Sequence, residues 1–134
     1  MMNVDEIRGF LAVEFPQSSA VVDSAEYGAA TVSQPVAFRH LRPGNTVSGP
    51  TLMELADCAI FVAIQSSIGP EPLAVTTNLN INFLRKPARD ADIVAKAKLI
   101  KIGKRLVIGD VLLYSVGSDA PVAHVTATYS VPPR

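Results

Sequence analysis

The sequence predicts an α+β fold in which an antiparallel sheet curls around one hydrophobic helix. Residues 51–67 form a long segment that is apolar on most of its circumference, which is typical of a buried helix. Four segments with β-strand patterning follow it, separated by short turn signals. A chain of 134 residues suits one core, so we expect a single domain over residues 1–134.

Two short elements are predicted before the central helix. Residues 4–14 have the apolar spacing of a helix, which Pro16 ends. Residues 29–38 are rich in β-branched side chains and predict a strand, but Pro35 interrupts it. Because proline cannot donate to a strand ladder, we expect an edge strand or a bulge there.

The central helix follows a loop, residues 40–50, whose proline and glycine content disfavours regular structure. Near its start, the apolar surface of the helix is interrupted by Glu54 and Asp57. Gly69 and Pro70 then provide a typical helix stop.

The four strands after the helix should form an antiparallel meander, because only short connections separate them. They cover residues 74–84, 91–102, 105–115 and 121–131. The first alternates cleanly between two faces, and its asparagine face is expected to meet solvent or another subunit. One face of this strand carries Thr77, Leu79, Ile81 and Phe83, and the other carries Thr76, Asn78, Asn80 and Asn82.

Charge and hydropathy narrow the class of protein. Twelve basic and twelve acidic residues cancel, so neither nucleic acid nor a membrane surface is an expected partner. No segment approaches the roughly 20 apolar residues that span a bilayer. The N-terminus carries acids where a signal peptide carries bases, so we expect a cytoplasmic protein. Apolar residues make up 49% of the chain, which suggests that copies of it bury surface against one another.

Metal and disulfide sites are not expected. Cys58 is the only cysteine, which excludes an internal disulfide and zinc sites built on cysteine pairs. We expect it to be an inert packing residue. His40 and His124 are isolated and lack metal-ligand spacing.

Several separated segments occur together in a characteristic order: SGPTLMELADCA, AVTTNLNINFLRKPA, KIGKRLVIGDVLLYS and VAHVTATYSVP. With them, the chain resembles the hotdog-fold thioesterases of the PaaI-like (phenylacetate-degradation) type over residues 28–131, with residues 1–18 as an N-terminal helical extension. The resemblance implies a hotdog fold, in which the sheet wraps around a long central helix and two chains dimerise side by side. It also implies hydrolysis of acyl-coenzyme A thioesters without a metal or cofactor, by homodimers or dimers of dimers (homotetramers).

The family motif at the start of the central helix can be placed on this sequence. In the family, a His-Gly-Gly turn begins the helix and an acid follows eight residues after the first glycine. Gly49 matches that glycine and Asp57 matches the acid. Ser48 stands in place of the histidine, Pro50 in place of the second glycine, and Arg42 in place of a loop asparagine.

Asp57 also needs a physical explanation, because an unpaired buried charge is costly. Such a group must find hydrogen-bond donors or change its pKa. In a cleft that excludes most of the solvent, the carboxylate can attack a thioester or deprotonate the water that does so. The structural alternatives are an acid bonded to a serine, a threonine or the backbone, and an acid that faces water at the helix edge.

The start of the helix suits oxyanion binding. Pro50 fits the first helical position, where its missing N–H costs nothing. The free N–H groups of Gly49 or Thr51 then point outward at the positive end of the helix dipole. One good donor of this kind stabilises a tetrahedral intermediate by roughly 3–4 kcal/mol. Ser48 can alternatively serve only as the helix cap.

Spacing along the helix predicts a dimer. Gly49 and Asp57 are eight residues apart, which corresponds to roughly 12 Å along a helix. One carbonyl cannot contact both groups within one chain. If both act on the same thioester, they come from two chains with antiparallel helices, and two sites lie at a twofold interface.

Further residues are expected to contact the acyl-CoA substrate. Thr76 matches a position that often carries serine or threonine near the reacting carbonyl, where it could place a water; otherwise it is an ordinary strand residue. Met53, Phe61 and Leu84 are expected to shape the acyl pocket. Basic groups bind the phosphates of coenzyme A, unless they are merely solvated turn residues. The expected substrate-binding residues are Ser48, Pro50, Arg42, Asn45, Arg85, Lys86, Lys104 and Arg105.

Two other functions remain open. The segment HLRPGN, followed by Glu54, is similar to hotdog hydroxyacyl-thioester dehydratases, in which His40 and Glu54 would form an acid–base pair. A non-catalytic hotdog module that binds acyl-CoA, or only dimerises, is the third possibility. The downstream segments NINFLRKP and GKRL match the thioesterases better, so hydrolysis is the expected function.

Overall fold

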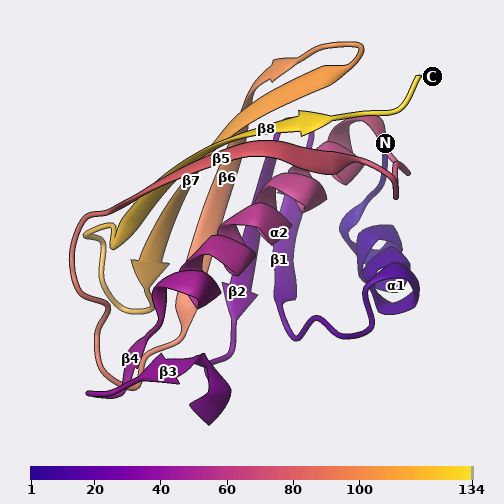
Figure 1. The fold of residues 1–134 in the computed structure, drawn as a ribbon. Coiled ribbons are helices and arrows are strands. Elements are labelled where there is room, and N and C mark those ends of the chain that lie inside the picture. Colours follow the sequence, from indigo (N-terminus) through magenta and orange to yellow (C-terminus); the bar gives the residue numbers. More distant parts are fainter. Residues whose placement is uncertain (134) are drawn as a thin grey trace.

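A computed structural model describes residues 1–133 and shows one sheet wrapped around one long helix (Figure 1). This arrangement confirms the predicted α+β class. The helices are α1 (Val4–Glu14) and α2 (Gly49–Ile68), with a 3₁₀ turn at Phe38–His40. The strands are β1 (Val21–Glu26), β2 (Ala29–Gln34), β3 (Leu41–Arg42), β4 (Thr46–Val47), β5 (Val75–Phe83), β6 (Ile93–Ile102), β7 (Leu106–Ser115) and β8 (Ala123–Ser130).

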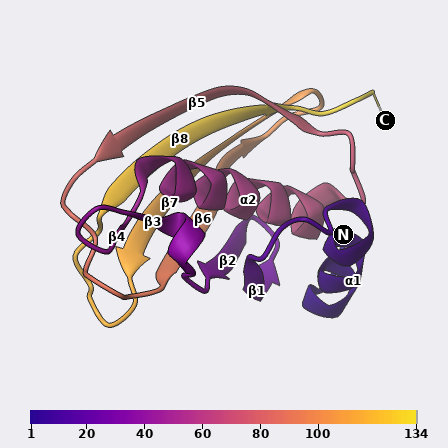
Figure 2. The ribbon, with the colours of Figure 1, turned by 60° about the horizontal axis from the view of Figure 1, so that its bottom comes forward.

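The main sheet has six strands in the order β1-β2-β6-β7-β8-β5, and every neighbouring pair is antiparallel. Strands β6, β7 and β8 form the predicted meander, but the prediction was wrong for β5, which pairs with β8 and not with β6. It curls so that α2 lies against its inner face, with β5 and β8 on one side of the helix and β1 and β2 on the other (Figure 2). Strands β3 and β4 form a separate small hairpin that leads into α2. The side of α2 that the sheet leaves open is where α1 packs.

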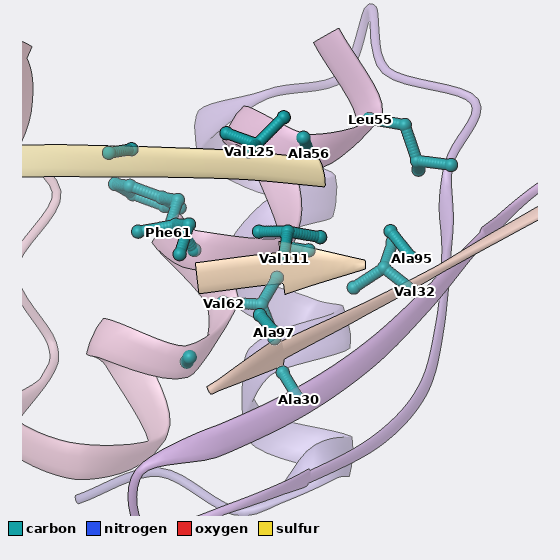
Figure 3. Packing of buried hydrophobic residues seen from close by; sticks show 14 of the residues in the cluster. Ala30, Val32, Leu55, Ala56, Phe61, Val62, Ala95, Ala97, Val111 and Val125 are labelled. Carbon is teal, nitrogen blue, oxygen red and sulfur yellow. The ribbon is translucent and has the colours of Figure 1, made fainter. Parts of the chain in front are cut away.

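Helix α2 is buried because its residues are apolar nearly all round. Twelve of its 20 residues are buried, among them Ile60, Val62 and Ile64, which are 0% exposed. Small and branched side chains from the sheet fill the space around it, as Figure 3 shows for Ala95, Val111 and their neighbours. Burial of this apolar surface supplies the main driving force for the fold.

Helix α2 begins and ends close to the predicted positions. Ser48 is its N-cap, and the side-chain oxygen accepts a hydrogen bond from the Thr51 amide at 3.4 Å. The first helical residue is Gly49, so Pro50 takes the second position and not the predicted first one. At the other end, the Gly69 amide donates to the Gln65 carbonyl at 3.1 Å.

The strands before α2 differ from the prediction. Strand β2 ends at Gln34, directly before Pro35, so the proline terminates the strand and makes neither an edge nor a bulge. Strand β2 is an interior strand between β1 and β6. The outer strand is β1, which the sequence analysis missed because its burial pattern does not alternate and a bulge follows Val22.

Strand β5 contains a bulge that reverses part of its predicted alternation. Thr76 pairs with Tyr129 and Asn78 pairs with Thr128, which leaves Thr77 as an extra residue. Thr76 therefore lies on the same side as the inward Leu79, facing α2. The prediction that placed Thr76 on the asparagine face was wrong, because a strict period of two cannot register an inserted residue.

The length of α2 corrects one statement about membranes. Among the described residues, α2 is the one helix long and apolar enough to cross a bilayer by these two criteria, whereas the sequence analysis found no such segment. In the fold, 67% of its most apolar window is buried inside the protein. A core helix of this kind satisfies the same criteria as a membrane span.

Candidate active site

The Asp57 carboxylate is held by two hydroxyl groups. The Thr76 hydroxyl donates to Asp57 Oδ1 at 2.6 Å, and the Tyr129 hydroxyl lies 2.7 Å from the same oxygen. The Tyr129 hydroxyl is also 3.0 Å from the main-chain carbonyl of Asp57. Asp57 Oδ2 has no hydrogen-bond partner within residues 1–133. One carboxylate oxygen is therefore fixed, and the other is available to a ligand.

Three separate elements build this cluster. Helix α2 supplies Asp57, the β5 bulge turns Thr76 toward the helix, and β8 supplies Tyr129 from its inward face. Asp57 is half-buried, whereas Tyr129 is 3% exposed. Of the two structural alternatives for Asp57, a bond to a threonine is present, and it leaves half of the carboxylate free.

Tyr129 belongs to the site but was not predicted. The alternation of residues 121–131 predicts β8, but no role for this residue follows from it. A signal was present, because a tyrosine among small apolar residues on an inward face must find a partner for its hydroxyl. Burial raises the pKa of Tyr129 well above its ordinary value, and the negative charge of Asp57 adds to this shift. The phenol is thus a hydrogen-bond donor at any physiological pH.

Cys58 follows Asp57 on α2 and is also next to the site. Burial raises the pKa of the Cys58 thiol to about 11, with the charges of Asp57 and Glu54 as further causes. The thiol is therefore protonated at neutral pH, and a protonated thiol is a poor nucleophile. Of these two neighbours, the carboxylate is the group with a reactive lone pair.

A cavity of about 560 Å³ opens beside Asp57. Its walls come from α1 and the following loop, from α2, and from the segment that leads into β5. Phe61 lies in its wall as expected, whereas Met53 and Leu84 are not among its lining residues. The lining residues are Leu11, Phe15, Gln17, Ser18, Ala20, Gln34, Glu54, Leu55, Asp57, Cys58, Phe61, Pro72, Leu73, Ala74, Val75, Thr76 and Tyr129.

The start of α2 presents a free backbone donor. The Gly49 amide has no acceptor within residues 1–133, and Pro50 has no amide proton. A Cβ at Gly49 would lie 3.2 Å from the ring of Phe83, so a side chain there would press on that ring. Ser48 caps the helix and also lies 2.9 Å from the Thr51 hydroxyl.

Three predicted substrate-binding residues lie near the N-terminus of α2. Arg42 and Asn45 belong to the exposed β3–β4 hairpin that leads into this helix. The Asn45 carbonyl accepts from the Asp90 amide, which ties the loop after β5 to the hairpin. Arg85 lies in that loop, where its Nε donates to the Pro121 carbonyl at 2.9 Å and leaves the rest of the guanidinium exposed.

The four predicted basic residues do not come together in one chain. Arg85 and Lys86 follow the end of β5, whereas Lys104 and Arg105 precede β7. Pairing through β8 aligns the start of β7 with the start of β5, so the two pairs lie at opposite ends of the sheet. A strand of 9 residues separates them by roughly 25 Å.

The side chain of His40 is buried and hydrogen-bonded to the backbone. It is 6% exposed, and its Nδ1 accepts a hydrogen bond from the Ala37 amide at 2.8 Å within the 3₁₀ turn. Burial lowers the pKa of His40, and the charge of Arg39 lowers it further. Glu54 lines the cavity, but His40 does not. The charge of Glu54 opposes this lowering of the pKa, so its carboxylate lies within electrostatic range of the imidazole, but no hydrogen bond joins the two side chains within residues 1–133.

Comparisons with known proteins agree with this geometry. The family model described as "Thioesterase superfamily" matches residues 44–129. A candidate thioesterase from Silicibacter sp. TM1040 has 41% sequence identity and a TM-score of 0.92, covering 99% of this chain and 94% of that chain. The phenylacetic acid degradation protein PaaI from Thermus thermophilus has 26% identity and a TM-score of 0.72, covering 91% and 97%. No curated protein matches.

A third structure was solved with a ligand. It is a Streptococcus mutans UA159 protein bound to acetyl CoA, with 20% identity and a TM-score of 0.77, covering 87% of this chain and 91% of that chain. At this level of identity the likeness shows a shared fold.

A sheet wrapped around one helix, with an acid in that helix beside a cavity, defines a hotdog-fold enzyme. The chain belongs to the thioesterase superfamily and is a thioesterase similar to the PaaI proteins. The expected family and enzyme class are thereby confirmed.

Proposed function

We propose that the protein hydrolyses an acyl-coenzyme A thioester, with Asp57 as the general base. One observation carries the proposal: Asp57 Oδ1 is fixed by Thr76 and Tyr129, while Oδ2 is free beside a cavity of about 560 Å³. A base held in this way can take a proton from a water placed against the substrate carbonyl. The acetyl CoA complex of the Streptococcus mutans protein supports the choice of coenzyme A as the thiol.

The chemistry uses the protein and water alone, with no metal and no further cofactor. The water oxygen attacks the thioester carbonyl carbon while the water gives one proton to Asp57 Oδ2. This attack produces a tetrahedral intermediate whose former carbonyl oxygen is negatively charged. The carbon–sulfur bond then breaks, and coenzyme A leaves as a thiol with the proton from Asp57. Thr76 and Tyr129 keep the carboxylate in place during both steps. Direct attack by Asp57 would instead form an anhydride intermediate.

A second copy of the chain supplies the oxyanion donor. The Gly49 amide is free, but it lies roughly 12 Å along α2 from Asp57, so it serves the site of a partner. Strand β5 supports a twofold dimer, because it is an edge strand of 9 residues with exposed Val75 and Phe83. Long exposed edges with apolar side chains are ordinarily covered.

The nucleotide end of coenzyme A would meet basic residues near the start of α2. Arg85 and Lys86 lie at that end of the sheet, close to Arg42 and Asn45 of the hairpin. Lys104 and Arg105 contribute to the same phosphates only if they come from another chain. Association of two dimers and a cytoplasmic location are parts of the same proposal.

Replacing Asp57 tests the proposed chemistry. Asp57→Asn keeps the size and one acceptor oxygen but removes the base, so we expect kcat to fall by about 10²–10⁴-fold. Release of the coenzyme A thiol from a panel of acyl-CoA esters provides the measurement. Circular dichroism and sedimentation should show an unchanged fold and assembly.

The control variants are Glu54→Gln and His40→Ala, with rates corrected for the folded fraction. Each should leave turnover within a few-fold of wild type. If His40→Ala abolished turnover and Asp57→Asn did not, the dehydratase chemistry would replace hydrolysis. If the wild-type protein bound acyl-CoA esters without cleaving any of them, the protein would be a binding module.

A further inference from the structure

The cavity beside Asp57 spans the open side of α2 between β5 and the end of β2. The reactive end is formed by β5 and β8, which supply Thr76 and Tyr129. The opposite wall is formed by α1, the loop after it and the end of β2, where Gln34 lies. Strands β2 and β5 are on opposite sides of α2 (Figure 2). An acyl chain that follows this cavity from Asp57 would run across α2 toward Gln34.

Gln34 is a buried polar residue in a mostly apolar cavity. It is 6% exposed, and its Nε2 donates to Ser19 Oγ and to the Pro35 carbonyl, both at 2.9 Å. A carbonyl can only accept, so the contact with Pro35 fixes which end of the amide is the nitrogen. Arg39 holds Ser19 Oγ in turn at 2.7 Å. The side chain is therefore locked in one orientation.

The amide oxygen of Gln34 has no partner within residues 1–133. It is not fully enclosed either, because no fully buried side-chain oxygen in the described part of the chain lacks a hydrogen bond. Because Gln34 lines the cavity, this partly accessible oxygen is a candidate acceptor for a group bound there. Gln65 shows the contrast: it is 0% exposed, and both ends of its amide are bonded to the Glu71 backbone.

The charges in the cavity limit which group can meet this oxygen. Glu54 and Asp57 are the charged residues among the described lining residues, and both are acidic. Arg39 lies behind Ser19 and not in the lining, and an ionised carboxylate at the far end of an acyl chain has no proton to donate to Gln34. A hydroxyl is neutral and can donate. The remaining lining near Phe15, Phe61 and Leu11 suits the apolar stem of such a chain.

We infer that Gln34 determines specificity by accepting a hydrogen bond from a hydroxyl at the far end of the acyl group. The preferred substrates are then ω-hydroxyacyl thioesters. This inference rests on the proposed thioester hydrolysis and adds the class of acyl group. A buried acceptor that is left without a donor is unfavourable. A site that hydrogen-bonds the substrate hydroxyl therefore discriminates against the analogue without it more strongly than an apolar site would.

The test compares matched acyl-CoA pairs that differ only in a terminal hydroxyl, over chains of about six to twelve carbons. In wild type, kcat/KM should favour the hydroxylated member at the chain length that reaches Gln34. In Gln34→Met this preference should fall by about five- to tenfold, the value of one hydrogen bond. In Gln34→Asn the acceptor retracts by one methylene, so the preferred chain should become longer. Gln17→Met, which also alters a cavity amide, should keep the preference.

Binding separates this inference from the proposed hydrolysis. Calorimetric titration of Asp57→Asn with the same acyl-CoA pairs measures the hydroxyl preference without turnover. If Gln34→Met does not fold, the shift in preferred length in Gln34→Asn decides. Equal affinities for the pair at every chain length, or a preference that Gln34→Met and Gln34→Asn leave intact, would overturn the role of Gln34. Absence of hydrolysis with a retained preference would overturn only the proposed function.

Discussion

At the scale of single residues, the site depends on how Asp57 is held. The carboxylate accepts from Thr76 at 2.6 Å and from Tyr129 at 2.7 Å, both on Oδ1. Charge-assisted O–H contacts of this length are strong and directional. They leave the second oxygen free, in a residue that lines the cavity. Catalysis by a positioned base depends on this kind of fixed geometry.

Removing the tyrosine hydroxyl should affect both activity and stability. In Tyr129→Phe, Asp57 loses one of two contacts that orient it, so we expect kcat to fall about tenfold with little change in KM. The free energy of unfolding should also fall by about 1–2 kcal/mol, because the hydrogen bonds of a buried phenol are lost. Steady-state kinetics and urea denaturation provide the two measurements.

Thr76→Val is the companion variant, because it removes the other donor to Asp57 while keeping the β-branched shape. A double-mutant cycle on kcat should show coupling between the two positions, since both act through one oxygen. A kcat that is unchanged in Tyr129→Phe, despite a measurable loss of stability, would mean that the tyrosine supports only the fold.

At the scale of elements, α2 and β7 meet at Gly109. A Cβ there would lie 2.5 Å from Cδ1 of Ile60 and 3.0 Å from Cδ2 of Leu99. Ile60 is 0% exposed, so its side chain is enclosed by the core. The glycine is therefore what allows the helix to approach the sheet this closely.

Gly109→Ala should destabilise the protein by about 1–3 kcal/mol through overpacking. Shortening the opposing side chain should relieve the overlap, so adding Ile60→Val should recover part of the loss. Chemical denaturation of the two single variants and the double variant tests this compensation. Strictly additive losses would show that the contact between α2 and β7 is not the cause.

The 3₁₀ turn before α2 should make stability depend on pH. Burial and the charge of Arg39 lower the pKa of His40 below 6.5 in the folded protein. The folded state then favours the neutral imidazole, so this contribution to stability is complete above pH 6.5 and is lost as the pH falls through the lowered pKa. The turn itself depends on neutral Nδ1, which accepts from Ala37.

We expect the free energy of unfolding to fall more steeply between about pH 7 and about pH 5 in wild type than in His40→Asn. Asparagine keeps an acceptor for the turn but does not titrate. Urea denaturation at several pH values gives the comparison. Parallel pH profiles for the two proteins would show that His40 does not contribute to acid sensitivity.

The elements that could be predicted from sequence are those with a regular apolar pattern or with an apolar run long enough for a buried helix. Helices α1 and α2 and strands β5, β6, β7 and β8 have such patterns, and the structure confirms their positions within a few residues. Strand β1 has no such pattern, since Val22 is its one buried residue. Asp57 could be identified from the sequence by its match to the family motif. Its contact with Thr76 could not, because that contact depends on a bulge in β5. A bulge is set by pairing with β8, which local sequence does not encode.

At the scale of the whole molecule, the sheet has two unlike edges. Strand β1 has 6 residues and a bulge, which makes it a poor template for further pairing. Strand β5 has 9 residues, and its outer edge is open within this chain. Exposed Phe83 and Leu84 extend an apolar surface beyond its end. The proposed pairing of two copies along β5 would cover this surface and bring each Gly49 toward the other chain's site.

The central claim is that each active site combines Asp57 of one chain with the Gly49 amide of another. Subunit mixing of Asp57→Asn with Gly49→Pro tests it most directly. Proline removes the amide donor and is tolerated in the first turn of a helix. Because its Cβ would lie 3.2 Å from the Phe83 ring, circular dichroism and sedimentation must show that this variant keeps its fold and assembly. A mixed dimer then contains one intact site, formed by Gly49 of the first chain and Asp57 of the second.

Each variant alone should be nearly inactive in release of the coenzyme A thiol. After the two are co-refolded at equal concentration, we expect activity to return to about a quarter of the wild-type value, since half of the dimers are mixed and each has one of two sites intact. Activity that stays at the sum of the two separate variants would contradict the account, because it would place both groups of a site in the same chain.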